Sequence, residues 1–242
     1  MRRHSRRGVA AGVLLACLAT LACVAAPAAV PAGYLRADAI RIEELLPAPP
    51  APGSDADRRD LDAVRAAQAA RTPATIAAAE ADAKVTVFRF ADVLGPGFAP
   101  ERAPKTEALF RAVAVDGARI AARAKDFWQR PRPYRADPAI TPLVGVSTDG
   151  AYPSGHAMFG CTAAVLLGVM VPEQRAALLA RGDAFGANRI TGGVHYPTDV
   201  AAGCTAGKVV AAVLLVTPAF AADFAAARDE TRQALGLPAL PR

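Results

Sequence analysis

Two of the three histidines in this chain lie within short polar blocks of an otherwise alanine-rich sequence. The first of these blocks, residues 152–156, reads Tyr-Pro-Ser-Gly-His; the other, residues 188–199, begins Asn-Arg, contains a histidine and ends in an aspartate. A third block upstream, residues 125–133, begins with lysine and ends Arg-Pro. Together they supply a nucleophile, a second imidazole for proton transfer, a carboxylate and several cations. This combination suits the binding and transfer of phosphate if the blocks meet in space.

The block at residues 188–199 contains the candidate nucleophile. Asp199 follows His195 by four residues, and Pro197 and Thr198 open a helix between them, so the carboxylate can hold one ring N–H of the imidazole. The other ring nitrogen is then unprotonated, aimed outward and able to attack phosphorus. Arg189, at the end of the preceding helix, can bind two phosphate oxygens. Taken alone, a histidine and an aspartate at this spacing are more often a capping contact.

The block at residues 152–156 predicts the start of a helix that binds an anion. Ser154 is a natural N-cap, and Gly155 allows a ligand to approach the backbone closely. His156, in the first turn, would lie beside the bound anion. The alternative for this block alone is an ordinary serine-capped helix with a surface histidine.

The block at residues 125–133 adds two cations. Lys125 closes a long helix, and Arg132 follows in a loop stiffened by proline. Alone, this block would be an ordinary basic helix terminus. With Arg189, however, it could surround the equatorial oxygens of a transferring phosphoryl group.

The composition limits the class of protein. The chain has 242 residues, which suits one domain with one core, and its formal net charge is +6. Four basic residues and no acids lie within the first 28 residues, so the remainder carries only +2. Without a basic stripe, a nucleic-acid partner is not expected. No His/Cys spacing is of the zinc-site kind, and no cofactor is expected.

Three segments are predicted along the chain. Residues 1–28 have the basic head, apolar stretch and small residues of a cleaved signal peptide, so we expect a periplasmic or secreted protein. An uncleaved anchor, or a lipid anchor at Cys23 or Cys17, stays open. Residues 29–54 are proline-rich and predict an extended, unpacked N-terminal arm. Residues 55–242 predict a helical domain, and because its apolar runs are short, no integral membrane association is expected.

The fold class predicted is an all-α, single-domain helical bundle, because alanine and leucine abound and β-branched alternation is scarce. Prolines 172, 197 and 218 stand where a first helical turn tolerates them. The expected helices are residues 55–71, 73–85, a short piece at 87–93, 104–128, 155–170, 172–188, 197–215 and 218–235, with a loop at 130–152.

Cys161 and Cys204 are the two cysteines that would remain after cleavage of the leader, and each follows one of the histidine blocks. In an oxidising compartment they could form a disulfide that ties the two site helices together. The alternative is two small, buried, free cysteines.

The order of the blocks, Lys-x6-Arg-Pro, Pro-Ser-Gly-His and Arg-x5-His-x3-Asp, resembles the signature of one superfamily. That superfamily joins type 2 phosphatidic acid phosphatases, bacterial class A acid phosphatases and vanadium haloperoxidases. Asn188 stands where the superfamily usually has serine before Arg189, and we expect it to replace a supporting hydrogen bond. Over residues 34–235 the chain looks most like the secreted class A non-specific acid phosphatases.

The resemblance implies the all-helical fold of this superfamily, a phosphatase that needs no metal, and often a homodimer. It also implies that His195 forms a phosphohistidine with Asp199 as its partner. His156 would protonate the leaving alkoxide and then activate water. The phosphate oxygens would be held by Lys125, Arg132, Ser154, Gly155 and Arg189.

The predicted function is therefore acid phosphatase activity of broad specificity on small-molecule phosphate monoesters. An acidic optimum is expected if His156 must be protonated while Asp199 stays ionised. Vanadate, which mimics the transition state, is the expected inhibitor. The alternatives are a vanadium-dependent haloperoxidase with His195 as the metal's ligand, a lipid or isoprenoid phosphate phosphatase, and a noncatalytic helical binding protein.

Overall fold

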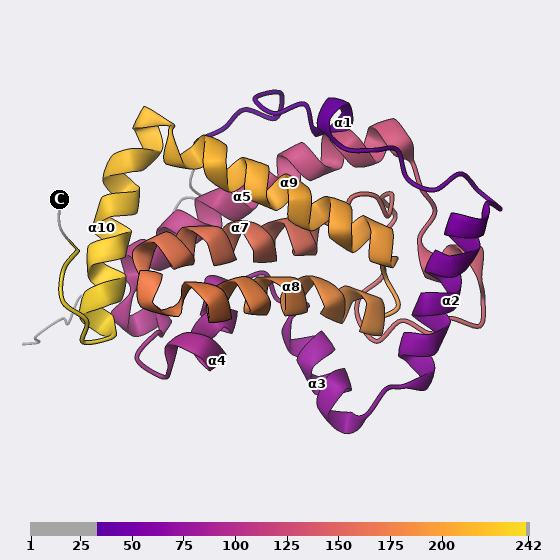
Figure 1. The fold of residues 1–242 in the computed structure, drawn as a ribbon, viewed down its shortest axis with the longest axis horizontal. Helices are drawn as coiled ribbons and strands as arrows, with labels where there is room; N and C mark the ends of the chain where they lie inside the picture. The colour runs from indigo at the N-terminus through magenta and orange to yellow at the C-terminus, as the bar shows by residue number, and fades with distance from the viewer. Residues whose placement is uncertain (1–32, 241–242) are drawn as a thin grey trace, which may run out of the picture.

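The computed structural model describes residues 33–240, in which the chain is helical with no β-strand (Figure 1). The predictions about the signal peptide and the lipid anchor at Cys23 or Cys17 lie outside these residues. The elements in chain order are α1 (Ile42–Leu45), α2 (Asp55–Ala69), α3 (Pro73–Ala81), η1 (Val87–Phe90), α4 (Ala91–Leu94), η2 (Pro100–Arg102), α5 (Pro104–Trp128), α6 (Pro133–Ala136), α7 (Gly155–Met170), η3 (Pro172–Gln174), α8 (Arg175–Thr191), α9 (Pro197–Leu215) and α10 (Pro218–Ala234).

The central helix of the bundle is α7. In Figure 1, α8 and α9 flank it, α5 lies behind it, and α10 crosses one end. Most residues of α7 are buried, as expected for a helix that is apolar almost all round. Met158 and Leu166 of α7, Phe185 of α8 and Val210 of α9 are fully buried in the main core. The all-α prediction is confirmed.

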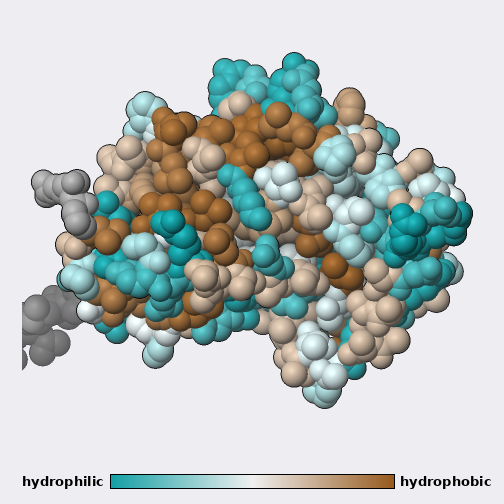
Figure 2. All heavy atoms as spheres, viewed as in Figure 1, coloured by the Kyte–Doolittle hydropathy of each residue, from teal (hydrophilic) through white to brown (hydrophobic). Residues whose placement is uncertain are grey.

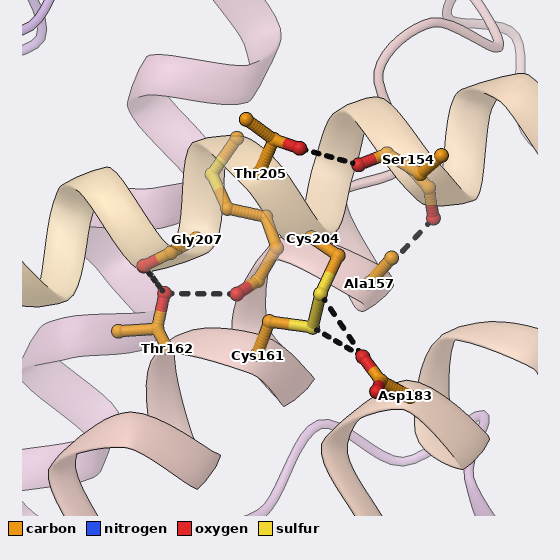
Figure 3. The surroundings of a disulfide bond; sticks show 10 residues. Ser154, Ala157, Cys161, Thr162, Asp183, Cys204, Thr205 and Gly207 are labelled. Carbon is orange, nitrogen blue, oxygen red and sulfur yellow. Dashed lines mark hydrogen bonds between the residues drawn. A yellow bond between two sulfur atoms is a disulfide. The ribbon is translucent and has the colours of Figure 1, made fainter. Parts of the chain in front are cut away.

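Two glycines let α9 approach α7 closely. A Cβ atom at Gly203 would lie 2.3 Å from the carbonyl oxygen of Ser154, and one at Gly207 would lie equally close to another carbonyl oxygen of α7. A disulfide between Cys161 and Cys204 joins the same two helices (Figure 3). The disulfide is therefore confirmed, and the alternative of two free thiols is wrong. These contacts fix the N-terminal ends of α7 and α9 side by side.

Four helix ends meet at one end of the bundle, on the right in Figure 1. They are the C-terminal ends of α5 and α8 and the N-terminal ends of α7 and α9, so two positive helix-dipole ends face the same place. Ser154 caps α7 as predicted, because its Oγ accepts the N–H of Ala157 at 3.3 Å. Gln129, with a left-handed φ of 49°, ends α5 and turns the chain into the loop that carries Arg132.

The N-terminal arm differs from the prediction for residues 29–54. In its described part, Leu35, Ile40, Ile42 and Leu46 are buried in the main core, and Ile42 opens the short helix α1. Asp116 of α5 accepts the backbone N–H of Leu35 at 3.1 Å and holds the arm against the bundle. The arm is therefore packed. The prolines that suggested an extended arm lie after these apolar residues, so they do not prevent the apolar residues from packing.

The predicted bounds of α5, α7 and α9 are correct, and three other predictions need correction. The helix predicted at 73–85 ends at Ala81, where Asp82 is buried and accepts hydrogen bonds from Arg181 of α8. The helix predicted at 172–188 is divided into η3 and α8, and α8 continues to Thr191. The predicted loop at 130–152 contains α6, a single turn that begins at Pro133, where proline is well tolerated.

By length and composition α9 could cross a membrane, with a mean hydropathy of 1.5 over 18 residues, half of them buried within the bundle. An apolar core helix of a soluble protein has the same properties. On the face shown in Figure 2, hydrophobic surface gathers toward α10 and the C-terminal half of α9, and hydrophilic surface covers the α2 end. The expectation of no integral membrane association stays a prediction.

Candidate active site

The structure brings the three sequence blocks together where the four helix ends meet. Arg132 Nη1 lies 2.8 Å from His195 Nε2, and the backbone N–H of Ser154 donates to the carbonyl oxygen of Asp199 at 2.9 Å. The predicted residues come from these elements: Lys125 from α5, Arg132 from the loop after it, Ser154, Gly155 and His156 from the start of α7, Arg189 from the last turn of α8, His195 from the turn between α8 and α9, and Asp199 from the first turn of α9.

The neighbours of His195 determine which of its nitrogens carries the proton. Arg132 Nη1 can only donate, so His195 Nε2 carries the lone pair. Nδ1 therefore bears the proton and lies 3.3 Å from Asp199 Oδ2. The same Oδ2 accepts the backbone N–H of Tyr196 at 2.9 Å, which fixes the carboxylate. This is the tautomer that a nucleophilic Nε2 requires.

The surroundings of Nε2 differ from the prediction that it is aimed outward. His195 is only 2% exposed, and its lone pair faces Arg132 instead of solvent. Burial, with repulsion from Arg132 and Lys125, lowers the pKa of His195 well below its ordinary value, so the ring is neutral. Attack on phosphorus therefore requires that Arg132 first moves its hydrogen bond from Nε2 to a phosphate oxygen.

Arg189 is a buried cation with two unsatisfied hydrogen-bond donors among the described residues. It is 3% exposed, and within the described residues its Nε and Nη1 have no hydrogen-bond partner. Burial and then repulsion from Arg132 lower the pKa of Arg189 to about 10, which still leaves the guanidinium charged near neutral pH. A buried, charged donor without an acceptor is costly. The geometry is that of a group that waits for an anion.

Asp149 contacts Lys125 and Arg132, two of the cations that were predicted to bind phosphate. Its Oδ2 accepts from Lys125 Nζ at 2.5 Å, and its Oδ1 accepts from Arg132 Nη2 at 2.6 Å. Although partial burial opposes ionisation, these bonds hold the pKa of Asp149 well below its usual range. The carboxylate therefore occupies two of the cations that would bind substrate. Asp149 was not predicted, since nothing local distinguishes it from the other loop acids.

Arg130 was not predicted either, and it binds three carboxylates at the site. Its Nη1 donates to Asp199 Oδ1 at 2.7 Å, and its Nη2 donates to Asp60 at 2.8 Å and Asp57 at 3.1 Å. Its guanidinium also lies over the ring of Tyr196, 3.9 Å from the centroid. Arg130 thus joins α2 to the carboxylate that holds His195. The Arg-Pro-Arg-Pro string at residues 130–133 could have indicated Arg130, but only its second arginine was predicted to be a site residue.

Arg130 also governs the charge of Asp199. Burial raises the pKa of Asp199 above its usual value, and Arg130, through charge and hydrogen bonding, opposes this rise. Asp199 must stay ionised to hold the Nδ1 proton of His195. An active site that works in acid therefore depends on Arg130.

His156 lies beside the cations with one nitrogen committed. Its Nε2 is 3.1 Å from the carbonyl oxygen of Ala83, which can only accept, so Nε2 bears a proton and Nδ1 is the nitrogen that titrates. Burial, then repulsion from Arg189, lowers the pKa of His156 to about 4. A phosphate dianion would neutralise that repulsion and raise this pKa, which favours the protonated form in the complex.

Asn188 makes the supporting contact expected of it. Its Nδ2 donates to Asp82 Oδ2 at 2.8 Å, and Asp82 also accepts from Arg181. Asn188 therefore ties the turn that carries Arg189 to the segment after α3. Among the described residues, the group of potential metal ligands is Cys161, Asp183 and Cys204, and its two sulfurs form the disulfide (Figure 3).

The chain matches one superfamily and is similar to several known proteins. Residues 108–222 match the sequence pattern of the PAP2 superfamily. A non-specific acid phosphatase of Salmonella typhimurium is 32% identical over 197 residues, 75% of this chain and 77% of that protein. One of Providencia stuartii is 29% identical over 213 residues, 81% of this chain and 84% of that protein. A solved bacterial vanadium-dependent iodoperoxidase shares the fold, with a TM-score of 0.50 at 16% identity over 70% of this chain and 51% of that one.

The helical fold and these matches define the class of protein. The chain belongs to the PAP2 superfamily and, within it, to the family of the bacterial non-specific acid phosphatases. It is a phosphatase of this superfamily.

Proposed function

We propose that this protein is a periplasmic or secreted acid phosphatase that hydrolyses a broad range of small phosphate monoesters. It acts through a phosphohistidine on His195 and needs no metal ion. Two features carry this proposal. Nε and Nη1 of the buried Arg189 lack acceptors among the described residues, and the neutral His195 holds a lone pair on Nε2. Broad tolerance follows because the charged groups grip only the phosphoryl group.

Substrate binding begins with an exchange of anions. The phosphoryl oxygens replace the carboxylate of Asp149 on Lys125 and Arg132, and a further oxygen fills the open donors of Arg189. The hydroxyl of Ser154 and the amide of Gly155 complete the set at the N-terminus of α7. Once Arg132 binds phosphate, the lone pair of His195 is free.

The first chemical step forms a bond between His195 Nε2 and phosphorus and breaks the bond between phosphorus and the ester oxygen. Protonated His156 gives its Nδ1 proton to the leaving oxygen, so an alcohol departs. The ring of His195 is then cationic, and Asp199 stabilises it through the Nδ1 proton.

The second step hydrolyses this intermediate. Neutral His156 takes a proton from water, and the oxygen of that water attacks phosphorus as the bond to Nε2 breaks. His156 is protonated again, His195 is neutral again, and inorganic phosphate leaves. The cations hold the equatorial oxygens in both steps, which is what this transition state requires.

The pH dependence follows from His156 and Asp199. The first step needs protonated His156, whose pKa is about 4 without substrate, so kcat/KM falls as pH rises through that value. Asp199 must be ionised, so activity also falls when pH drops below its pKa. The optimum is therefore acidic.

The test is hydrolysis of p-nitrophenyl phosphate from acid to neutral pH, by purified protein in excess chelator, beside His195→Ala. Chelator-resistant activity with an acidic optimum that is lost in the variant supports the proposal. Vanadate should inhibit at concentrations far below those of phosphate. Folded protein without activity, or activity that returns only with added metal, contradicts it. Halide oxidation with added vanadate would then favour the haloperoxidase alternative.

His156→Asn tests the acid role separately. p-Nitrophenolate leaves without a proton, whereas an alkoxide does not, so the variant should lose far more activity on ethyl phosphate than on p-nitrophenyl phosphate. Equal losses on both esters would contradict general-acid catalysis by His156.

We also propose that the protein is exported and forms a homodimer. The leader pattern of residues 1–28 and the disulfide between Cys161 and Cys204 both favour an oxidising compartment. Cell fractionation with mass measurement of the mature chain tests export and any lipid on Cys23 or Cys17. Light scattering tests the expected homodimer.

A further inference from the structure

A cavity of about 210 Å³ opens directly from the candidate active site. Lys125, Asp149, Gly155 and His156 form its wall at one end. Because His156 would protonate the leaving oxygen, the part of a substrate beyond that oxygen must start at this end of the cavity. The position of the cavity therefore makes it the place for the leaving group.

The rest of the cavity wall is apolar. The apolar side chains come mainly from α5, with one from α7 and one from the segment after α3: Val113, Ala114, Ala118, Ala122, Phe159 and Val85. Beyond the charged end, the one polar side chain among the described lining residues is Thr162. Its hydroxyl is taken by the carbonyl oxygens of Met158 and Gly207, at 2.8 and 3.0 Å.

Beyond the charged end, the described side chains of this wall offer no free hydrogen-bond donor to a sugar or a glycerol. Hydroxyl groups buried there would lose water without gaining a partner, which is costly. An alkyl or aryl group would instead gain from burial. Because an apolar cavity of about 150 Å³ can hold benzene, a volume of about 210 Å³ suits a short chain or a small ring system.

The space continues beyond this cavity. A second cavity of about 450 Å³ shares Val85, Ala114 and Phe159 with the first, and extends along α5 to Glu107 and Arg111. A chain that fills the first cavity therefore has an apolar path toward the surface before it meets charged residues.

We propose that these two cavities form a leaving-group site that selects phosphate monoesters of alkyl or aryl alcohols over those of sugars and polyols. This proposal rests on the proposed function, because it assigns the leaving-group end of the same site. Selectivity comes from apolar burial along α5, and the cations treat every phosphoryl group alike.

The test uses n-alkylphosphonates from methyl to hexyl, which bind without being hydrolysed. Their dissociation constants, measured by calorimetry, should fall by up to about fourfold per added CH₂, the worth of burying one methylene, until the first cavity is full. Because no turnover is involved, this result does not depend on the phosphatase assay. Equal affinity for methyl- and hexylphosphonate would overturn the proposal, even if the enzyme hydrolyses p-nitrophenyl phosphate.

A cavity-filling variant locates the effect. Ala118 lies on an exposed part of α5 in the cavity wall, so Ala118→Phe should fold, bind methylphosphonate as the wild type does, and lose the gain with chain length. Ala212→Phe makes the same change at an exposed alanine of α9 that lines neither cavity, and should keep the gain. A gain that persists in Ala118→Phe would overturn the assignment to these cavities.

Discussion

Arg130 and Arg189 are both buried near His195, and they differ in what they bind. Arg130 donates to three carboxylates and lies on an aromatic ring, whereas two nitrogens of Arg189 have no partner among the described residues. Burying an arginine is tolerable when acceptors surround it, so Arg130 needs no ligand. Among the described residues Nε and Nη1 of Arg189 lack such acceptors, so a bound anion would stabilise it.

This difference in hydrogen bonding gives the two arginines different tasks within one site. Arg130 maintains the charge and position of Asp199 whether or not substrate is present. In the proposed mechanism Arg189 acts only on the substrate. Asp149 belongs between these cases, because it supplies Lys125 and Arg132 with a carboxylate that substrate can replace.

The largest effect is expected from Arg189→Ala. Loss of a preorganised donor to the transferring group typically costs about 10²–10³-fold in kcat, and kcat/KM on p-nitrophenyl phosphate should fall by at least that much. Thermal stability should not fall, since no protein hydrogen bond from Nε or Nη1 is lost. Arg189→Lys should recover part of the activity. A loss below about fivefold in Arg189→Ala would remove Arg189 from the phosphate site.

Arg130→Lys should change the pH profile instead. The variant keeps a positive charge but loses the charge-assisted hydrogen bond to Asp199, worth about 1.5–3 kcal/mol, or about one to two pH units. The pKa of Asp199 rises further, so activity is lost at higher pH as the medium is acidified. The acid limb of kcat/KM therefore moves upward.

Arg232→Lys is the matched control for Arg130→Lys. Arg232 is also buried and binds Glu173, but it lies on α10, away from the four helix ends. It should lower thermal stability and leave the pH profile unchanged. Equal profiles for Arg130→Lys and the wild type would mean that Arg130 does not control Asp199.

Asp149→Asn should have a smaller effect, on anion affinity. The pair is partly exposed, so each contact is worth at most about 1 kcal/mol, and removal of the competing carboxylate should tighten inhibition by phosphate about two- to fivefold. The measurement is the inhibition constant of phosphate at fixed pH. Weaker inhibition would show instead that Asp149 keeps hold of the cations while phosphate is bound.

The disulfide should affect stability and not chemistry. It closes a segment with a sequence separation of 43, for which chain entropy predicts about 4 kcal/mol of stabilisation and experience about 2–4 kcal/mol. Cys161→Ala with Cys204→Ala should lower the melting temperature measured by calorimetry, with an unchanged pH profile at low temperature. A shifted profile would mean that the link between α7 and α9 also tunes the site.

The sequence was informative where chemistry lies in short blocks. The helices that carry His156, Asp199 and Lys125 were predicted with correct bounds, because prolines and a serine cap mark where they begin. Long apolar helices with clear caps leave little choice of structure. The bundle and the meeting of the three blocks followed from these elements.

The partners that complete the site could not be predicted in the same way. Arg130 acquires its role only because α2, about 70 residues earlier, brings Asp60 and Asp57 to it. Asp149 reaches the site because of the path that its loop takes. The sequence of that loop has no periodicity from which the path could be predicted. The N-terminal arm was predicted wrongly for another reason. Its prolines indicated an extended, unpacked segment, whereas its apolar residues pack into the core.

The central claim is that His195 receives the phosphoryl group. The direct measurement is to mix enzyme with p-nitrophenyl phosphate, stop the reaction in alkali, which preserves phosphohistidine, and identify the modified peptide by mass spectrometry. The account predicts one phosphoryl group on His195, formed during turnover and absent from His195→Ala. Full turnover with no phosphoryl group on the chain, or with one on another residue, would contradict it.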